Sequence, residues 1–259
     1  MRIALGLEYD GSNFSGWQSQ KGVRTVQATL EQALSAVANE PVTVITAGRT
    51  DAGVHAAAQV VHFDTATFRL EHNWVFGGNA NLLPEVAILW AQPVNEAFHA
   101  RFSAIARHYR YIILNRGARP AIANRRVTWY CQPLSVTKMK EAGAFLVGEH
   151  DFSSFRAKAC QAKSPVRNVH YLEVTRQGDW IVIDISANAF LHHMVRNIAG
   201  VLMAIGKGEQ PPRWAEEVLQ ARCRAVGGVT ARPDGLYLVR VDYPDHFDLP
   251  RLSRPVTVW

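Results

Sequence analysis

Residues 47–56 form a short segment that gathers side chains able to do chemistry. It holds a guanidinium at Arg49, a carboxylate at Asp51 and an imidazole at His55, set among glycines. An ionised carboxylate can attack an electrophilic carbon or remove a proton, and loops between rigid strands commonly hold such groups. The alternative is a tight turn in which Asp51 accepts hydrogen bonds from backbone amides and Arg49 is solvated.

Two side chains of the second half could support a carboxylate of this kind. Arg196 lies on the polar side of an expected amphipathic helix, and a guanidinium beside a carboxylate keeps it ionised in a partly dry pocket. Tyr109 lies on an expected strand. The ordinary alternatives are that Arg196 is a solvated surface arginine and that Tyr109 is a core aromatic. Tyr111 shares the face of Tyr109, and we expect a packing role for it.

The other histidines and glycines do not match a metal or nucleotide site. His55 stands four residues after Asp51, and His192 and His193 are adjacent, but the ligand spacing is incomplete and no cysteine lies nearby. The glycines at 200–208 lack the Gly-Lys-Ser/Thr of a phosphate-binding loop. We therefore expect no metal and no nucleotide hydrolysis.

The composition is that of an ordinary globular protein with a basic balance. The chain has 259 residues, 48% of them hydrophobic, and a formal net charge of +6, which favours phosphate-rich partners without proving one. Its three cysteines lie far apart and cannot form a complete disulfide framework, so we expect a reduced, cytoplasmic protein. No apolar run approaches the length of a membrane span, so we expect no membrane partner.

Hydrophobic periodicity predicts the elements that must position these side chains. In the first half we expect strands at 3–9, 42–46, 60–63 and 86–91 and helices at 25–37 and 70–76. In the second half we expect strands at 107–114, 169–175, 181–186 and 236–243 and helices at 136–147, 191–205 and 214–224.

The order of these elements predicts the fold class. The first half reads β-α-β-β-α-β, and the second repeats this order with an extra helix, which is typical of split βαβ units with antiparallel sheets and helices on one face. We therefore expect an α+β protein made of two ferredoxin-like, RRM-like halves, residues 1–104 and 105–259, with a cleft between them.

Several blocks of the chain resemble the TruA family of tRNA pseudouridine synthases. The segment GRTDAGVHA at residues 48–56 is similar to the signature of that family. Other blocks similar to the family occur in its order, at residues 9–12, 16–18, 79–82, 98–102, 109–111, 151–156, 192–197 and 235–238. Because the blocks occur in both halves and span nearly the whole chain, coincidence does not explain them.

The resemblance implies an isomerase that converts uridine to pseudouridine at positions 38, 39 and 40 in the anticodon arm of tRNA. It assigns the catalytic carboxylate to Asp51, supported by Arg49, Tyr109 and Arg196, with Tyr109 also stacking on the target uracil. It implies a homodimer. The reaction replaces an N1–C1′ bond with a C5–C1′ bond without net oxidation, so we expect no cofactor.

The substrate contacts follow from the same resemblance. The target base is buried in stacked RNA and must be extruded, which favours basic side chains beside the pocket. After Arg49, the resembling segments and nearby basic positions give the candidates Arg69, Phe98, His99, Arg101, Phe102, Lys158 and Lys163. The alternatives are solvated charges and, for the two lysines, a mobile surface loop.

Two other functions are open from the sequence. A catalytically silent RNA-binding protein of the same fold would keep the arginines and lose the carboxylate, but Asp51 is present. A glycoside-cleaving enzyme needs paired carboxylates, and Asp51 has no obvious acidic partner in the resembling blocks. Departures from the family at 115–126, at 227–232 and in the tail concern RNA contacts rather than the chemistry.

Overall fold

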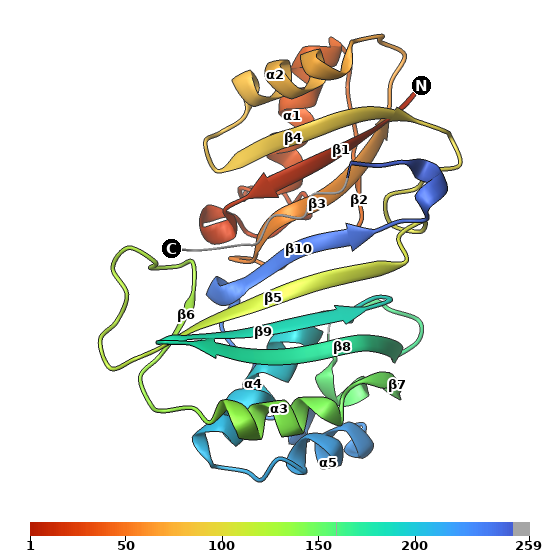
Figure 1. Cartoon of the computed structure of the whole chain (residues 1–259). Coiled ribbons are helices and arrows are strands. Elements are labelled where there is room, and N and C mark those ends of the chain that lie inside the picture. The colour runs from red at the N-terminus through yellow and green to blue at the C-terminus, as the bar shows by residue number, and fades with distance from the viewer. Residues whose placement is uncertain (159, 251–259) are drawn as a thin grey trace. The chain divides into compact units, whose positions relative to one another are not determined.

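The structure, a computed structural model, describes residues 1–158 and 160–250. The chain forms two units, the first made of Met1–Ile105 together with the chain after Leu236, the second of Ala106–Leu236 (Figure 1). The predicted halves differ from these units, because the segment from Tyr237 onward belongs to the first unit and not to the second. The predicted C-terminal tail lies outside the described residues from position 251.

The first unit is built on an antiparallel sheet to which one parallel strand is added. Its strands are β1 (Arg2–Tyr9), β2 (Ile45–Thr46), β3 (His55–Asp64), β4 (Val86–Val94) and β10 (Leu236–Asp242). β1 lies between β3 and β4, β2 pairs with β3, and β10 pairs in parallel with β3. Leu5 of β1 is therefore opposite both Val61 and Ala91 and is fully buried.

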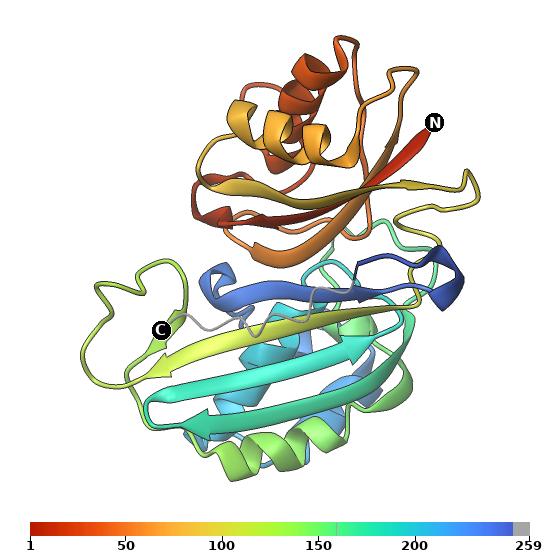
Figure 2. The same cartoon turned by 45° about the horizontal axis from the view of Figure 1, so that its top comes forward.

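The helices α1 (Val26–Ala38) and α2 (Glu71–Asn81) pack together on one face of this sheet (Figure 2). α1 begins after Thr25, whose hydroxyl oxygen accepts the Ala28 N–H at 3.4 Å. α2 extends beyond the predicted 70–76, since its glycines serve close packing rather than a helix end. A Cβ added at Gly78 would lie 2.3 Å from the Ile88 side chain of β4.

The strands of the second unit pair mainly antiparallel. Its strands are β5 (Ala106–Asn115), β6 (Thr128–Tyr130), β7 (Gly148–Asp151), β8 (Val166–Gln177) and β9 (Trp180–Ala187). β9 pairs with β5 and β8, β8 also pairs with β7, and β6 runs parallel to β5. β6 and β7 are not among the strands predicted from the sequence, because strands of three and four residues carry too little alternation to be recognised.

Three helices pack against one another on one face of the strands of the second unit (Figure 2): α3 (Val136–Ala144), α4 (Met194–Lys207) and α5 (Trp214–Ala221). The apolar stripe predicted for α4 is buried. The helix begins three residues later than predicted, because His193 adopts a left-handed backbone conformation with φ of 62°. It ends at Gly208, with φ of 88°.

Both units thus combine mainly antiparallel strands with α-helices, which makes the protein α+β. Within residues 1–158 and 160–250, no helix combines the length and the apolar character that crossing a membrane requires.

Candidate active site

The loop that carries Asp51 connects β2 to β3 and is held by backbone hydrogen bonds on both sides of the carboxylate. The Thr50 carbonyl accepts the Trp17 N–H at 2.9 Å, and the Gly53 N–H donates to Phe14 O at 3.3 Å. The Asp51 carbonyl accepts the Val54 N–H at 3.1 Å and closes a turn. The loop backbone is therefore fixed against the segment that follows β1, and the Asp51 side chain is half-buried.

Hydrogen bonds of three buried side chains, Tyr9, Thr50 and Gln59, hold the loop in place. The hydroxyls of Tyr9 and Thr50 are hydrogen-bonded at 2.7 Å. The Gln59 amide donates to the Gly48 carbonyl at 2.7 Å and to the Tyr9 hydroxyl at 3.4 Å. Burial raises the pKa of Tyr9 to about 12, so its O–H remains a hydrogen-bonding group. The residues on both sides of Arg49 are thus fixed, while the Arg49 side chain is exposed.

Two glycines allow the preceding segment to approach the loop. A Cβ at Gly11 would lie 2.0 Å from the Val54 carbonyl oxygen, and one at Gly16 would lie 2.9 Å from the Thr50 carbonyl oxygen. Gly16 also has φ of 89°, in the region that favours glycine. The family-like blocks at 9–12 and 16–18 therefore support the loop that carries Asp51.

His55, at the start of β3, is an anchor beneath the loop. Its ring is buried and stacks on Tyr237 with 4.6 Å between the ring centroids. Its Nδ1 lies 3.1 Å from the Gly11 N–H nitrogen and 3.2 Å from a carboxylate oxygen of Asp10. Nδ1 accepts from Gly11 when it is unprotonated and donates to Asp10 when it is protonated, so the two hydrogen bonds exclude each other. The hydrogen bond from His55 lowers the pKa of Asp10.

In the second unit, Tyr109 and Tyr111 of β5 have different surroundings. Tyr109 packs edge-to-face against Phe190, with 5.1 Å between the ring centroids, and is 8% exposed. Tyr111 is fully buried, with its hydroxyl 2.6 Å from the Thr128 hydroxyl and donating to the Arg232 carbonyl at 2.8 Å. Burial raises the pKa of Tyr111 above its ordinary value. Tyr111 is therefore a packing residue.

Arg196 lies in the first turn of α4 and is half-buried. Its Nε donates to the Ala231 carbonyl at 2.9 Å, and the Ala231 N–H donates to the Arg196 carbonyl at 3.1 Å. A Cβ at Gly200 would lie 1.9 Å from the Val229 carbonyl oxygen, so the segment 229–231 lies directly against the helix.

The next residue of α4, Asn197, ties this segment down. Asn197 is fully buried, and its side-chain oxygen accepts from Thr230 Oγ1 at 2.6 Å and from Arg224 Nη2 at 3.0 Å. Its amide donates to the Phe155 carbonyl at 2.7 Å. In the sequence, residues 227–232 stand out only as a departure from the family pattern, whereas in the structure part of this segment contacts and supports Arg196.

The predicted substrate contacts of the 98–102 block separate into one buried and three accessible side chains. Phe98 is fully buried, with Tyr243 and Phe247 each 5.1 Å from its ring. It has no free face for RNA, so the prediction of a contact is corrected to a packing role. Phe102 is 77% exposed, lies 4.4 Å from the His99 ring and has the Arg101 guanidinium 5.6 Å from its ring centroid.

The other predicted basic contacts differ in exposure. Arg69 precedes α2, is half-buried and donates to the Phe68 carbonyl at 2.9 Å. Lys158 and Lys163 are exposed. The Arg156 guanidinium donates to the carbonyls of residues 160 and 162 at 2.7 and 2.9 Å.

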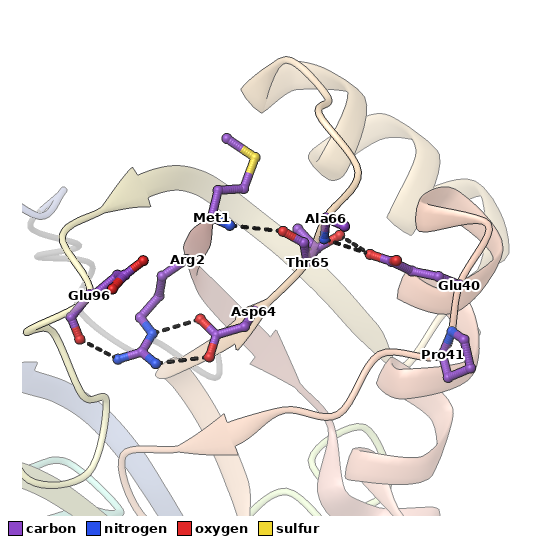
Figure 3. A pocket seen from close by; sticks show the side chains of 8 residues that line it. All are labelled: Met1, Arg2, Glu40, Pro41, Asp64, Thr65, Ala66 and Glu96. Carbon is purple, nitrogen blue, oxygen red and sulfur yellow. Dashed lines mark hydrogen bonds and ion pairs between the residues drawn. The ribbon is translucent and has the colours of Figure 1, made fainter.

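A pocket of the first unit contains none of the predicted site residues (Figure 3). Its volume is about 590 Å³, and it is lined by Met1, Arg2, Glu40, Pro41, Asp64, Thr65, Ala66 and Glu96. Arg2 forms two hydrogen bonds of 2.8 Å with Asp64, and Glu40 accepts from Thr65 and from the Ala66 N–H. Arg2 and Asp64 lie at the ends of β1 and β3 opposite to Tyr9 and His55, so this pocket is separate from the Asp51 loop.

Comparison with known proteins matches the sequence to a family. The family model described as tRNA pseudouridine synthase matches residues 7–103 and 142–244. The chain is 60% identical to tRNA pseudouridine synthase A of Methylococcus capsulatus over 97% of this chain and 93% of that protein. It is 57% identical to the protein of the same name in Coxiella burnetii, over 97% and 96% of the two chains. The match to that of Pseudomonas aeruginosa is 60%, over 96% and 88%. The chain therefore belongs to the tRNA pseudouridine synthase family.

Proposed function

We propose that this protein is a tRNA pseudouridine synthase that isomerises uridine at positions 38, 39 and 40 of the anticodon stem-loop, with Asp51 as the catalytic carboxylate. The observation that carries the proposal is the Asp51 loop, in which hydrogen bonds hold Gly48, Thr50, Gly53 and Val54 while the carboxylate itself is half-buried. A carboxylate that is held in this way can act on a sugar without first changing its position.

The proposed reaction needs little beyond positioning and charge. The N1–C1′ bond of uridine breaks, the detached uracil turns, and a C5–C1′ bond forms. C5 then loses its proton and N1 gains one, so the composition does not change. Asp51 attacks the sugar or removes a ribose proton to start this sequence. No cofactor enters the proposed reaction.

The second unit supplies the partners of Asp51 in this proposal. Arg196 keeps the carboxylate ionised, and Tyr109 stacks on the target uracil. The hydrogen bond from Arg196 Nε to the Ala231 carbonyl supports the first role, because it holds the guanidinium in a defined place. The proposal includes two ferredoxin-like halves with a cleft between them, a homodimer and a cytoplasmic location.

The RNA contacts of the proposal are Arg49, Arg69, His99, Arg101, Phe102, Lys158 and Lys163. The exposure of Arg49 and of the cluster formed by Arg101 and Phe102 supports these contacts, since exposed guanidinium groups and aromatic rings bind phosphates and unstacked bases.

The test uses unmodified tRNA with uridine at positions 38 to 40. Purified protein is incubated with this tRNA, pseudouridine is mapped by chemical labelling, and Asp51→Ala is assayed in parallel. We expect modification at these positions by the wild type and none by the variant, with RNA binding retained. RNA binding by the wild type without modification would favour the catalytically silent alternative.

A further inference from the structure

The connection from β5 to β6 is a basic, exposed segment of the second unit. Residues 116–126, named here the arginine loop, contain Arg116, Arg119, Arg125 and Arg126. No acidic residue occurs in the sequence between Glu96 and Glu141, so the loop has no carboxylate near it along the chain. All four arginines are exposed.

The arginine loop has an ordered backbone that presents these side chains. Ala123 is 8% exposed and anchors the middle of the loop, and its carbonyl accepts the Arg126 N–H at 3.1 Å. The Arg116 carbonyl accepts the indole N–H of Trp129 at 2.8 Å. The Trp129 ring is 39% exposed, so an aromatic surface lies beside the guanidinium groups.

Two arginines of this loop differ in their surroundings from two other exposed arginines of the unit, Arg213 and Arg222. Arg213 lies 3.5 Å from Glu216, and Arg222 lies 3.6 Å from Asp151. Arg116 and Arg119, by contrast, meet no carboxylate within the part of the chain that the structure describes. The guanidinium groups of Arg116 and Arg119 therefore suit a polyanion, because guanidinium groups bind phosphate oxygens with two hydrogen bonds.

We propose that the arginine loop is a further RNA-binding surface, which holds the phosphate backbone of the substrate tRNA away from the target uridine. The inference rests on the proposed function. Arg116 follows the end of β5 seven residues after Tyr109, which is roughly 20 Å along an extended strand. If Tyr109 contacts the target base, this surface reaches phosphates several nucleotides away, and Trp129 adds an aromatic contact there.

The first test measures how the affinity for whole tRNA depends on salt. The double variant Arg116→Ala/Arg119→Ala is compared with wild type and with Arg213→Ala/Arg222→Ala, which removes the same charge from paired positions. Each lost phosphate contact reduces the slope of log affinity against log salt by about 0.7 to 0.9. Between 50 and 200 mM salt, tRNA affinity falls by a certain factor. We therefore expect this factor to be about tenfold smaller for the loop variant than for wild type. The control variant should keep the wild-type slope.

A second measurement separates this proposal from the proposed function. With saturating tRNA the loop variant should isomerise uridine at the wild-type rate, and its affinity defect should be smaller on an isolated anticodon stem-loop. If the salt slope of the loop variant equals that of wild type, or changes only as much as that of the control variant, the arginine-loop proposal is overturned. The proposed function is then still intact. Failure of the wild type to isomerise uridine would overturn the proposed function, and the slopes would still decide whether the loop binds RNA.

Discussion

At the scale of single residues, the Asp51 carboxylate depends on groups that its own loop does not contain. Thr50 is held by Tyr9, and Gly48 is held by Gln59, from two different strands. The sequence pattern indicated Asp51 and Arg49 as candidates because they are charged residues in a glycine-containing loop. It could not indicate Tyr9 or Gln59, since a hydroxyl or amide on a buried strand reveals its partner only in the folded chain.

Removing the Tyr9 hydroxyl should therefore impair catalysis, although this hydroxyl does not contact the substrate. In Tyr9→Phe, the buried groups of Thr50 and Gln59 lose a partner, which should cost about 1–3 kcal/mol of unfolding free energy. We expect kcat to fall about tenfold with tRNA affinity unchanged, as for a misplaced catalytic group. Tyr243→Phe is the matched control, because it removes a hydroxyl that donates to the Ala100 carbonyl of the same unit. Equal kcat losses in both variants would show that the Tyr9 hydroxyl has no special role.

His62 should make the stability depend on pH. Burial is the largest of the causes that lower the pKa of His62 from 6.5 to about 4. The His62 Nδ1 accepts the Ala100 N–H at 3.0 Å, which requires this nitrogen to be unprotonated. The unfolded chain takes up this proton at higher pH than the folded protein does. Stability should consequently fall as the pH drops from 6.5 toward 4, by about 2 kcal/mol between pH 7 and pH 5.

Urea unfolding of wild type and of His62→Gln at pH 7, 6 and 5 measures this dependence. The variant should show a flatter pH profile whatever its absolute stability, with a remaining slope in part from His99, whose pKa is also lowered. An unchanged profile in the variant would assign the pH dependence to other groups.

At the scale of elements, the sequence predicts the helix α4 well but does not predict the segment 229–231 that packs against it. Its apolar residues recur at helical spacing over several turns, so the sequence alone indicates the helix and its buried face. β3 was predicted to begin at residue 60 but begins at His55, because residues 55–59 lack the β-branched residues that mark a strand. The support of Arg196 by the segment 229–231 is a contact between distant parts of the chain and leaves no periodic signal.

A methyl group at position 200 tests this support. In Gly200→Ala, the new Cβ would lie 1.9 Å from the Val229 carbonyl oxygen, so the segment that receives the Arg196 guanidinium must move. We expect a loss of about 1–3 kcal/mol in unfolding free energy and a decrease in kcat of about tenfold or more. Gly206→Ala on the same helix is the control, since its Cβ would meet the flexible Met139 side chain. A Gly200→Ala variant with wild-type kcat would mean that the segment does not position Arg196.

At the scale of the whole molecule, the order of elements in the sequence predicts the α+β class but not the path of the last strand. The predicted boundary at 104 followed from the repeated order of elements, but that order cannot show that the chain returns to the first unit after Leu236. The return depends on the pairing of Tyr237 and Leu238 with β3 and on the stacking of Tyr237 on His55. These contacts join residues far apart in the sequence, and they tie the last strand to the element that follows the Asp51 loop.

The most direct measurement of the central claim is the release of tritium from tRNA that carries uridine labelled at C5, with enzyme in excess. Pseudouridine formation removes the C5 hydrogen, so the wild type should release one tritium per target uridine. Asp51→Asn, which keeps the shape and loses the charge, should bind the tRNA and release tritium at least a thousandfold more slowly, about the loss expected for a catalytic carboxylate. Release at the wild-type rate by Asp51→Asn would contradict the assignment of Asp51, and no release by the wild type would contradict the proposed reaction itself.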